Sequence, residues 1–375
     1  MRKTVVCILL LTLLLCGCQP NKSQSQVAIQ DLGIPTMEQY SDDLISRCPW
    51  DMVVWNNKLY VGAGDYGANT GPVDCMAYDL QTAAWENSGT VLEESIARFC
   101  VVNNTLTIPG IDSTMDGHVL GEYYFLQEGK WQLNRTLPGG IHCFDLVEYN
   151  QQLFAGLGVT QGEYPVAVSA DGGETFNQVP FYKDGQPLQT TKDAIRVYDL
   201  VVLNNTLYAF YISENNEPNK ENDFECCVYQ YQDNRFVYQS TWNPYLQSVG
   251  LTQMPFASKA VFQNQLYIAT GYLYQATDSL NGFQQVMLEG QPITADLVVQ
   301  EDGLYILNNQ PKTDGTFDVS VWRTNNGEDF EQVLYFNYKT PALSFTINGE
   351  TYFIGIGNPS LQHQTNGTIL AVTLS

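Results

Sequence analysis

The chain repeats one short pattern, in which an apolar run, a polar turn and a second apolar run follow one another. Three copies are "VVWNNKLYVG" (53–62), "LVVLNNTLYAF" (200–210) and "LVVQEDGLYIL" (297–307). Seven copies align on one anchor residue, and successive anchors are 47, 47, 54, 59, 38 and 47 residues apart. The anchors are Leu59, Leu106, Leu153, Leu207, Leu266, Leu304 and Thr351. Two apolar runs around an Asn-, Gln- or Gly-rich turn predict a β-hairpin in every copy.

An aromatic residue follows each hairpin and indicates two more strands per repeat. These aromatics are Trp85, Trp131, Phe176, Phe236, Phe283 and Phe330. Four antiparallel strands in a repeat of roughly 40–50 residues are typical of one blade of a β-propeller. The sequence therefore predicts an all-β, seven-bladed propeller over residues 34–375, with six blades as the alternative because of the short spacing of 38. The last copy lacks a fourth strand, so an N-terminal strand near residues 36–41 is expected to close the ring.

The N-terminus predicts export and attachment to a membrane. Arg2 and Lys3 precede an apolar run of twelve residues (5–16), which is too short to span a bilayer but fits a signal peptide. Leu15-Cys16-Gly17-Cys18 resembles a bacterial lipobox, which implies that residues 1–17 are removed and that Cys18 carries lipid. Residues 18–33 are then a lipidated cysteine and polar tether, and the protein faces the cell exterior or the periplasm. An ordinary secretory signal is the alternative.

The charge and the cysteines restrict the partners and leave the disulfides open. With 17 basic and 40 acidic residues, the net charge is −23, which disfavours nucleic-acid binding because phosphates require Lys and Arg. Six cysteines follow Cys18, and outside the cytoplasm they are expected either to form disulfides or to remain buried thiols. They are Cys48, Cys75, Cys100, Cys143, Cys226 and Cys227.

One turn of the third repeat carries a family resemblance. The segment "SADGGETF" (169–176) resembles the Asp-box of BNR-type propellers, with Ser169, Asp171, Gly173, Thr175 and Phe176 at the motif positions and Phe in place of Trp. This resemblance, together with the kelch-like repeat length, implies a propeller of the sialidase-type or kelch-like superfamily. The box implies a folding role for these five residues, since a short carboxylate bonds turn backbone and Gly accepts its dihedrals.

The distant similarity to sialidases implies one enzymatic alternative. Sialidases bind a carboxylate with three arginines, the first in an Arg-x-Pro segment, and use acidic residues in catalysis. Arg47-Cys48-Pro49 matches that segment, and the weak catalytic candidates are Arg47, Asp65, Arg98, Asp145 and Arg196. A sialidase-like glycoside hydrolase or lyase is therefore the alternative to a protein that only binds.

The repeat also brings a set of side chains to one end of the expected central channel. Eight residues before each anchor stand Asp51, Arg98, Asp145, Asp199, Ser258, Asp296 and Leu343. This position opens the innermost strand, so the seven side chains are expected around one axis, with Arg47, His142, Arg196 and Lys259 nearby. Two interpretations remain open. The aspartates either form a recognition site for a sugar, a peptide or a cation, or they accept backbone N–H bonds and tie neighbouring blades together.

The predicted ligand-binding residues are Asp51, Arg98, His142, Arg196, Trp242, Tyr245 and Lys259. Trp242 and Tyr245 lie on a long loop, where they either stack on a ligand or roof the channel. Asp112 and Asp116 offer two carboxylates to Ca²⁺, although the spacing fits no full calcium loop, and no other cofactor is expected. The chain has none of the common catalytic motifs. The sequence therefore predicts a non-catalytic lipoprotein that binds a glycan, a peptide or an envelope protein, or that serves as a scaffold.

Overall fold

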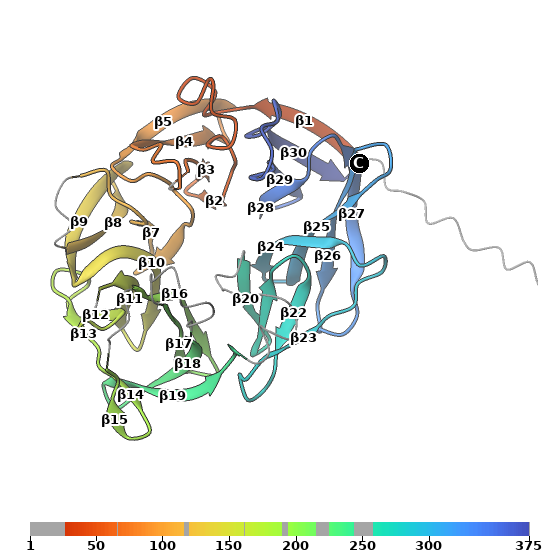
Figure 1. Cartoon of the computed structure of the whole chain (residues 1–375). Coiled ribbons are helices and arrows are strands. Elements are labelled where there is room, and N and C mark those ends of the chain that lie inside the picture. The colour runs from red at the N-terminus through yellow and green to blue at the C-terminus, as the bar shows by residue number, and fades with distance from the viewer. Residues whose placement is uncertain are drawn as a thin grey trace, which may run out of the picture.

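The computed structural model describes residues 27–65, 67–115, 120–160, 162–189, 194–214, 225–243 and 258–374. Thirty β-strands, β1 to β30, lie in these residues, which confirms the all-β prediction. The sheets stand around a central opening, and the chain visits them in order around the ring (Figure 1). Within the same residues there is no helix with the length and apolar character needed to span a membrane.

Five of the sheets are separate four-stranded antiparallel blades. In four of them the spatial order of the strands is their order in the chain, and the fifth combines the two ends of the described chain. The blades are β2 (Met52–Trp55), β3 (Lys58–Val61), β4 (Val73–Asp79) and β5 (Ala84–Val91); β6 (Cys100–Val102), β7 (Thr105–Pro109), β8 (Leu120–Gln127) and β9 (Lys130–Pro138); β20 (Ser258–Phe262), β21 (Gln265–Ala269), β22 (Leu273–Ala276) and β23 (Phe283–Gln285); β24 (Ile293–Gln300), β25 (Gly303–Pro311), β26 (Phe317–Thr324) and β27 (Glu331–Tyr338); and β28 (Ala342–Asn348), β29 (Thr351–Ile356), β30 (Ile369–Leu374) and β1 (Val27–Gly33).

The sixth sheet has ten strands, so the prediction of seven blades, and also that of six, is wrong. Its strands are β10 (Gly140–Tyr149), β11 (Gln152–Val159), β12 (Val166–Ser169), β13 (Asn177–Gln178), β14 (Phe181–Lys183), β15 (Gln186–Pro187), β16 (Ala194–Leu203), β17 (Thr206–Glu214), β18 (Glu225–Gln232) and β19 (Arg235–Thr241). The repeats around Leu153 and Leu207 merge because β11 pairs with β16 at Gly158↔Arg196 and Val159↔Ile195. The structure therefore has five blades and one curled ten-stranded sheet.

The merger has a physical cause in the length of this part of the chain. The two inner strands of this sheet, β10 and β16, have ten residues each and are longer than any other inner strand, and the spacing of 54 between the two anchors accommodates β16. It also accommodates the hairpin β14–β15, of which β14 runs parallel to β19 through Phe181↔Phe236. Longer strands reach past the blade edge and find backbone partners, as exposed strand edges tend to do.

Strand β1 closes the ring, and its position corrects the prediction of closure by residues 36–41. It pairs antiparallel with β30 from Val27↔Leu374 to Gly33↔Ile369, whereas residues 35–40 form turns. The closing strand thus lies in the segment that the sequence assigns to the tether. Its polar residues misled the prediction, because an outermost strand buries little and does not need an apolar pattern. Residues 1–26, with the predicted signal peptide and Cys18, lie outside the described residues.

The hairpin turns explain the Asn-rich centres of the repeats. In five copies both turn residues have positive φ, from Asn56 (48°) and Asn57 (60°) to Gln263 (50°) and Asn264 (60°). A two-residue turn with positive φ at both positions matches the twist of the flanking strands, and Asn tolerates this conformation better than most residues do. Each such turn therefore fixes the register between the inner strand and its neighbour.

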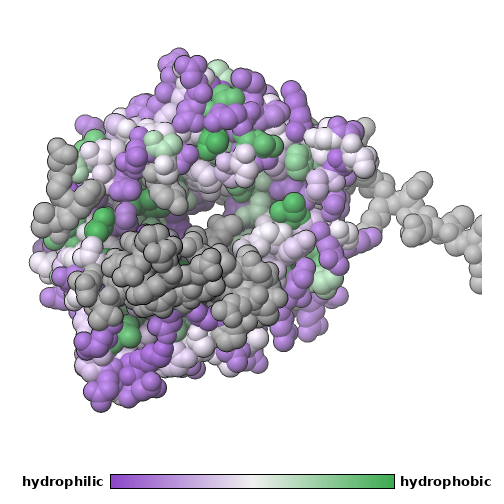
Figure 2. Space-filling model, viewed as in Figure 1, coloured by the Kyte–Doolittle hydropathy of each residue, from purple (hydrophilic) through white to green (hydrophobic). Residues whose placement is uncertain are grey.

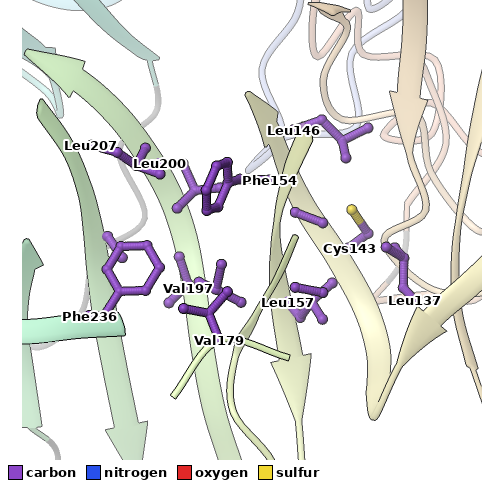
Figure 3. Close-up of a cluster of buried hydrophobic side chains, with 14 of the residues drawn as sticks. Leu137, Cys143, Leu146, Phe154, Leu157, Val179, Val197, Leu200, Leu207 and Phe236 are labelled. Atoms are coloured by element: carbon purple, nitrogen blue, oxygen red, sulfur yellow. The ribbon is translucent and has the colours of Figure 1, made fainter. Parts of the chain in front are cut away.

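The apolar cores lie between and within neighbouring sheets. Figure 3 shows part of the largest cluster, in which Phe154 of β11 lies beside Leu200 of β16, with Leu146, Leu157, Val197 and Leu207 around them. This packing joins both halves of the ten-stranded sheet into one core. All six cysteines after Cys18 are buried free thiols in this structure, so of the two expectations for them the second holds.

Candidate functional site

An aspartate near the start of an inner strand ties that strand to the next inner strand. The Oδ1 atom of Asp51 accepts a hydrogen bond from the N–H of Met52 over 2.8 Å, and Oδ2 accepts one from the N–H of Phe99 over 2.7 Å. The same bridge is made by Asp145 to Leu146 and Leu200, and by Asp296 to Leu297 and Phe345. These aspartates thus have the tying role that the sequence left open beside ligand recognition, and they stand around one axis.

Side-chain cations contact the aspartate where the ten-stranded sheet meets the blade that begins with β20. There Lys259 donates hydrogen bonds to both Asp145 and Asp199, the latter over 2.8 Å. Arg98 reaches the same two carboxylates, with Nη2 3.0 Å from Asp199 Oδ1 and Nη1 3.3 Å from Asp145 Oδ1. Two cations and two buried carboxylates from four successive inner strands therefore form one compensated cluster.

The opposite charges in this cluster favour the ionised forms of Asp199 and Arg98. Burial opposes the charge of Asp199, but Lys259 and Arg98 outweigh it and hold the pKa of Asp199 below its usual value. Burial likewise opposes the charge of Arg98, while Asp199 and Asp145 raise the pKa of that guanidinium. Each charge depends on the others, so removal of any one leaves a buried charge without compensation.

Asp51 and Asp296 have a different electrostatic environment. Burial raises the pKa of Asp51 to about 7, and the neighbouring carboxylate of Asp296 adds to the shift. Burial also raises the pKa of Asp296 to about 6. In the described residues neither carboxylate has a salt-bridge partner. Asp51 is held by two backbone N–H donors, and Asp296 by two backbone N–H donors and a side-chain hydrogen bond with Ser258. Near neutral pH these two groups therefore titrate, and a nearby positive charge favours their ionised form.

A cavity of about 340 Å³ lies among these side chains at the mouth of the channel. Its charged lining residues are Asp51, Arg98, Asp145, Lys259 and Asp296, and its apolar lining includes Val101, Val298 and Phe345. Figure 2 shows that the ring is open at its centre. Three of the seven predicted ligand-binding residues, Asp51, Arg98 and Lys259, line the cavity together with the catalytic candidate Asp145. Trp242 does not line it.

His142 and Arg196 are partly buried and are not among the residues that line this cavity. The Nδ1 atom of His142 contacts the Ile111 carbonyl and lies 4.0 Å from Asp112 Oδ1. The Arg196 guanidinium lies over the ring of Tyr198, 5.9 Å from its centre. Both residues precede the aspartate position in their long inner strands, by three residues each, and this places them beyond the carboxylates.

Arg47 does not join the channel mouth, which corrects its expected position nearby, and the catalytic candidate Asp65 is not among the residues that line the cavity. Arg47 is buried, and its Nε and Nη2 atoms donate to the Tyr40 and Ser41 carbonyls over 2.7 and 2.5 Å. Asp65 accepts the N–H of Gly67 over 2.9 Å and organises its own turn. Since Arg47 is bound to backbone and Arg98 to carboxylates, the sialidase-like arginine triad is not assembled in the described structure.

The prediction that Trp242 forms an exposed stacking platform is wrong. Its side chain is 0% exposed, and Nε1 donates to the Leu280 carbonyl over 2.7 Å. Its ring packs on Phe210 and Phe283 at centroid distances of 4.8 and 4.1 Å, between the ten-stranded sheet and the next blade. A large aromatic next to a blade boundary gains more from this burial than from solvent contact. Tyr245 lies outside the described residues.

The Asp-box segment folds as a self-contained turn, consistent with a structural role. Ser169 Oγ donates to Asp171 Oδ1 over 2.7 Å, and the N–H of Gly173 donates to Ser169 Oγ over 2.8 Å. The Thr175 hydroxyl and N–H both donate to Asp171, and these bonds hold the pKa of that carboxyl below its usual value. Phe176 is buried against Tyr123, with ring centroids 6.1 Å apart.

The expected calcium pair is only partly described, because Asp116 lies outside the described residues. Among the residues that the structure describes, no group of three or more His, Cys, Asp or Glu side chains is placed to hold a metal ion. The sequence missed a second buried acidic pair, Glu93 and Glu122, at the junction of the first two blades. Burial raises the pKa of Glu93 well above its usual range, and contact with Glu122 adds to this. Neither residue occupies a repeated position, so no pattern pointed to them.

Comparisons with known proteins show the fold alone. No protein family matches the sequence, and no curated protein does. Among solved structures, virginiamycin B lyase from Staphylococcus aureus, in a catalytically inactive form with quinupristin, has a TM-score of 0.53 at 9% identity and covers 93% of this chain and 100% of its own. A chain of the Mitotic Checkpoint Complex has a TM-score of 0.52 at 10% identity and covers 100% and 99%.

The chain is a β-propeller. At such low identity the likeness carries neither the reaction of the lyase nor the assembly of the checkpoint protein to this propeller. It also does not distinguish the BNR, kelch and other propeller families from one another.

Proposed function

We propose that this propeller is a non-catalytic binding protein whose ligand enters the cavity at the channel mouth. The observation that carries the proposal is the cavity of about 340 Å³, which five charged side chains from different inner strands surround. Three of its carboxylates are fixed by backbone N–H donors, and Arg98 and Lys259 are fixed by Asp145 and Asp199. A pre-organised polar site with an apolar wall is what binding of a glycan unit or a peptide side chain requires.

The test is binding by the full chain to a glycan array and a peptide library, with two matched variants. Val101 lines the cavity and Val299 does not, although both are exposed valines of inner strands, at 50% and 44%. Val101→Trp fills the cavity and is expected to abolish binding, whereas Val299→Trp is expected to retain it. If both variants bind every ligand as the unmodified chain does, the cavity is not the site.

A second candidate, a glycoside hydrolase or lyase, is favoured by one observation. The pKa of Asp51, raised to about 7 by burial, lies where a general acid or base operates. The two candidates differ in the fate of the bound ligand. A binding protein releases it unchanged, whereas an enzyme releases fragments, which mass spectrometry of the eluted ligand detects. Asp51→Asn then abolishes cleavage if Asp51 is the acid.

We further propose that Cys18 carries lipid and anchors the propeller to the bilayer on the exported side of the membrane. The support is the lipobox-like sequence 15–18 after an apolar signal. Labelling of cells with radioactive palmitate is expected to mark the protein and to fail in Cys18→Ala. Binding to an envelope protein, rather than to a free ligand, would appear as co-purification that Val101→Trp does not affect.

A further inference from the structure

The cavity at the channel mouth contains more negative than positive side chains. Arg98 and Lys259 both pair with Asp145 and Asp199, so the two cations are fully used within that cluster. Asp51 and Asp296 remain on the cavity lining with no cation of the described chain in salt-bridge contact. The seventh inner position, Leu343, adds no charge. A ligand that enters therefore meets two carboxyl groups that form no ion pair within the described residues, although Arg98 acts on Asp51 from a longer distance.

The rest of the cavity wall is apolar. Val101 is 50% exposed although it lies on an inner strand, and Val298 and Phe345 also line the space. Successive residues of a strand face opposite sides, and in β6 Val101 is exposed between the buried Cys100 and Val102. An exposed apolar side chain in a cavity offers binding energy to an apolar ligand surface, at about 25 cal/mol per Å².

We propose that the ligand is an organic cation, whose ammonium or guanidinium group pairs with Asp51 and Asp296 and whose apolar body contacts Val101 and Val298. This inference rests on the proposed function and names the chemical class of the ligand. A free amine and the side chain of a lysine or arginine in a peptide share this chemistry. The excess of acidic residues in the whole chain, 40 against 17 basic ones, draws such ligands toward the protein.

The titration of the two carboxyls gives the inference a distinctive signature. Burial raises the pKa of Asp51 to about 7 and that of Asp296 to about 6, so both hold protons for part of the time near pH 6.5. A bound cation stabilises the ionised form and expels those protons. The other charged groups at the site, Arg98, Asp145, Asp199 and Lys259, already compensate one another. Binding at pH 6.5 is therefore expected to release protons, and binding at pH 8.5 is not.

The experiment uses three probes of equal shape, 2-phenylethylamine, 2-phenylethanol and 3-phenylpropionate, with the full chain in an isothermal titration calorimeter. The amine is expected to bind at least tenfold more tightly than the alcohol, and the carboxylate is expected not to bind. Titration in two buffers of different ionisation enthalpy counts the released protons. A peptide with a single central lysine, compared with the same peptide acetylated on that lysine, shows whether a side chain binds as the free amine does.

Variants of Val101 test the charge without disturbing the aspartates that tie the sheets. Val101→Lys places a cation in the cavity and is expected to bind the amine at least tenfold more weakly than the uncharged Val101→Met, whereas the outlying Val299→Lys is expected to stay within threefold of the unmodified chain. Circular dichroism confirms that each variant is folded.

The outcomes separate this inference from the proposed function. If the amine and the lysine peptide fail to bind while a neutral glycan or peptide binds and is excluded by Val101→Trp, the cationic ligand is disproved and the cavity remains a binding site. If amine binding is equal in Val101→Lys and Val101→Met, or releases no protons at pH 6.5, the pairing with Asp51 and Asp296 is disproved. If Val101→Trp excludes no ligand, both proposals fall.

Discussion

Lys259 donates a hydrogen bond to Asp199 over 2.8 Å, across the junction between the ten-stranded sheet and the blade that begins at β20. Asp51, Asp145 and Asp296 instead accept a backbone N–H of the next inner strand. Between β16 and β20 a side-chain cation takes the place of that backbone donor. Arg98 contacts the same carboxylate, so the junction also includes a residue from the blade on the other side of the ten-stranded sheet.

Lys259→Met is expected to destabilise the fold by about 3 kcal/mol or more, because it leaves Asp145 and Asp199 buried with only Arg98 for compensation. Chemical denaturation measures the loss. Lys312→Met is the control, since Lys312 is 39% exposed and lies 3.5 Å from Asp318, and it is expected to cost less than about 1 kcal/mol. Equal losses in the two variants would show that the cluster does not hold the junction.

Ionisation of Asp296 is expected to lower the stability of the folded protein as the pH rises. Its pKa is raised to about 6 by burial, so the folded state binds more protons than the unfolded state between about pH 4 and pH 6. Its stabilising effect is complete below that window and is lost as the pH rises through it. The stability of Asp296→Asn relative to the unmodified chain, measured by denaturation midpoints, should therefore increase from pH 4 to pH 7.

The matched control for this titration is Asp302→Asn. Hydrogen bonds from Tyr305 and Arg323 hold the pKa of Asp302 below its usual value, so its contribution is present above the unfolded pKa and is lost at lower pH. The stability of Asp302→Asn relative to the unmodified chain should therefore decrease as the pH rises. The same slope in both variants would contradict the electrostatic difference between the two sites.

Two adjacent glycines in the Asp-box turn separate backbone strain from steric conflict. Gly172 and Gly173 both have positive φ, 79° and 103°, but a Cβ at Gly172 meets nothing within 4 Å, whereas one at Gly173 lies 2.3 Å from the Tyr123 hydroxyl. Gly172→Ala is expected to cost about 1 kcal/mol, and Gly173→Ala about 1–3 kcal/mol more. Thermal denaturation measures both, and Tyr123→Phe should recover part of the second loss by removing the hydroxyl.

Deletion of the closing strand is expected to destabilise the ring strongly. Without residues 27–33, β30 loses its hydrogen-bonded partner and becomes an exposed edge. A chain that lacks residues 19–33 should unfold at a much lower denaturant concentration and aggregate, whereas one that lacks only residues 19–26 should match the intact chain. Identical midpoints for the two deletions would mean that β1 is dispensable.

The six cysteines after Cys18 are expected to resist thiol reagents in the folded protein. All six are buried, and burial raises the pKa of Cys75 and of Cys100 to about 12, so little reactive thiolate exists at neutral pH. Ellman's reagent should report six thiols only after denaturation. Rapid labelling of the native protein, or fewer than six thiols in denaturant without reductant, would point to exposure or to disulfides.

The repeat was the most informative part of the sequence, because its register depends on local chemistry. The eight-residue offset from Leu59, Leu153 and Leu304 placed Asp51, Asp145 and Asp296 on one axis, as their shared contacts with the next strand now show. Hairpin turns such as Asn56-Asn57 were equally predictable, since their residues suit positive φ. The sequence of a single repeat is enough to predict these features.

Structural features that depend on contacts between different repeats were not predictable from the sequence. The pairing of β11 with β16 through Gly158 and Arg196 comes from strand ends that no local pattern marks. Trp242 is buried because neighbouring sheets supply Phe210 and Phe283 around it. Similarly, Arg47 turns to the carbonyl of Tyr40, which is a contact set by the loop that enters the first blade.

The ring closes with a strand that starts at Val27, nine residues after Cys18. If Cys18 is held in the bilayer, nine residues of fully extended chain reach about 30 Å. The first described residue can then never rise farther than that from the lipid surface, and it lies on the outer rim of the wheel. With Cys18 anchored as we propose, the tether is too short for the propeller to range freely, and the closing edge of its rim stays beside the lipid headgroups.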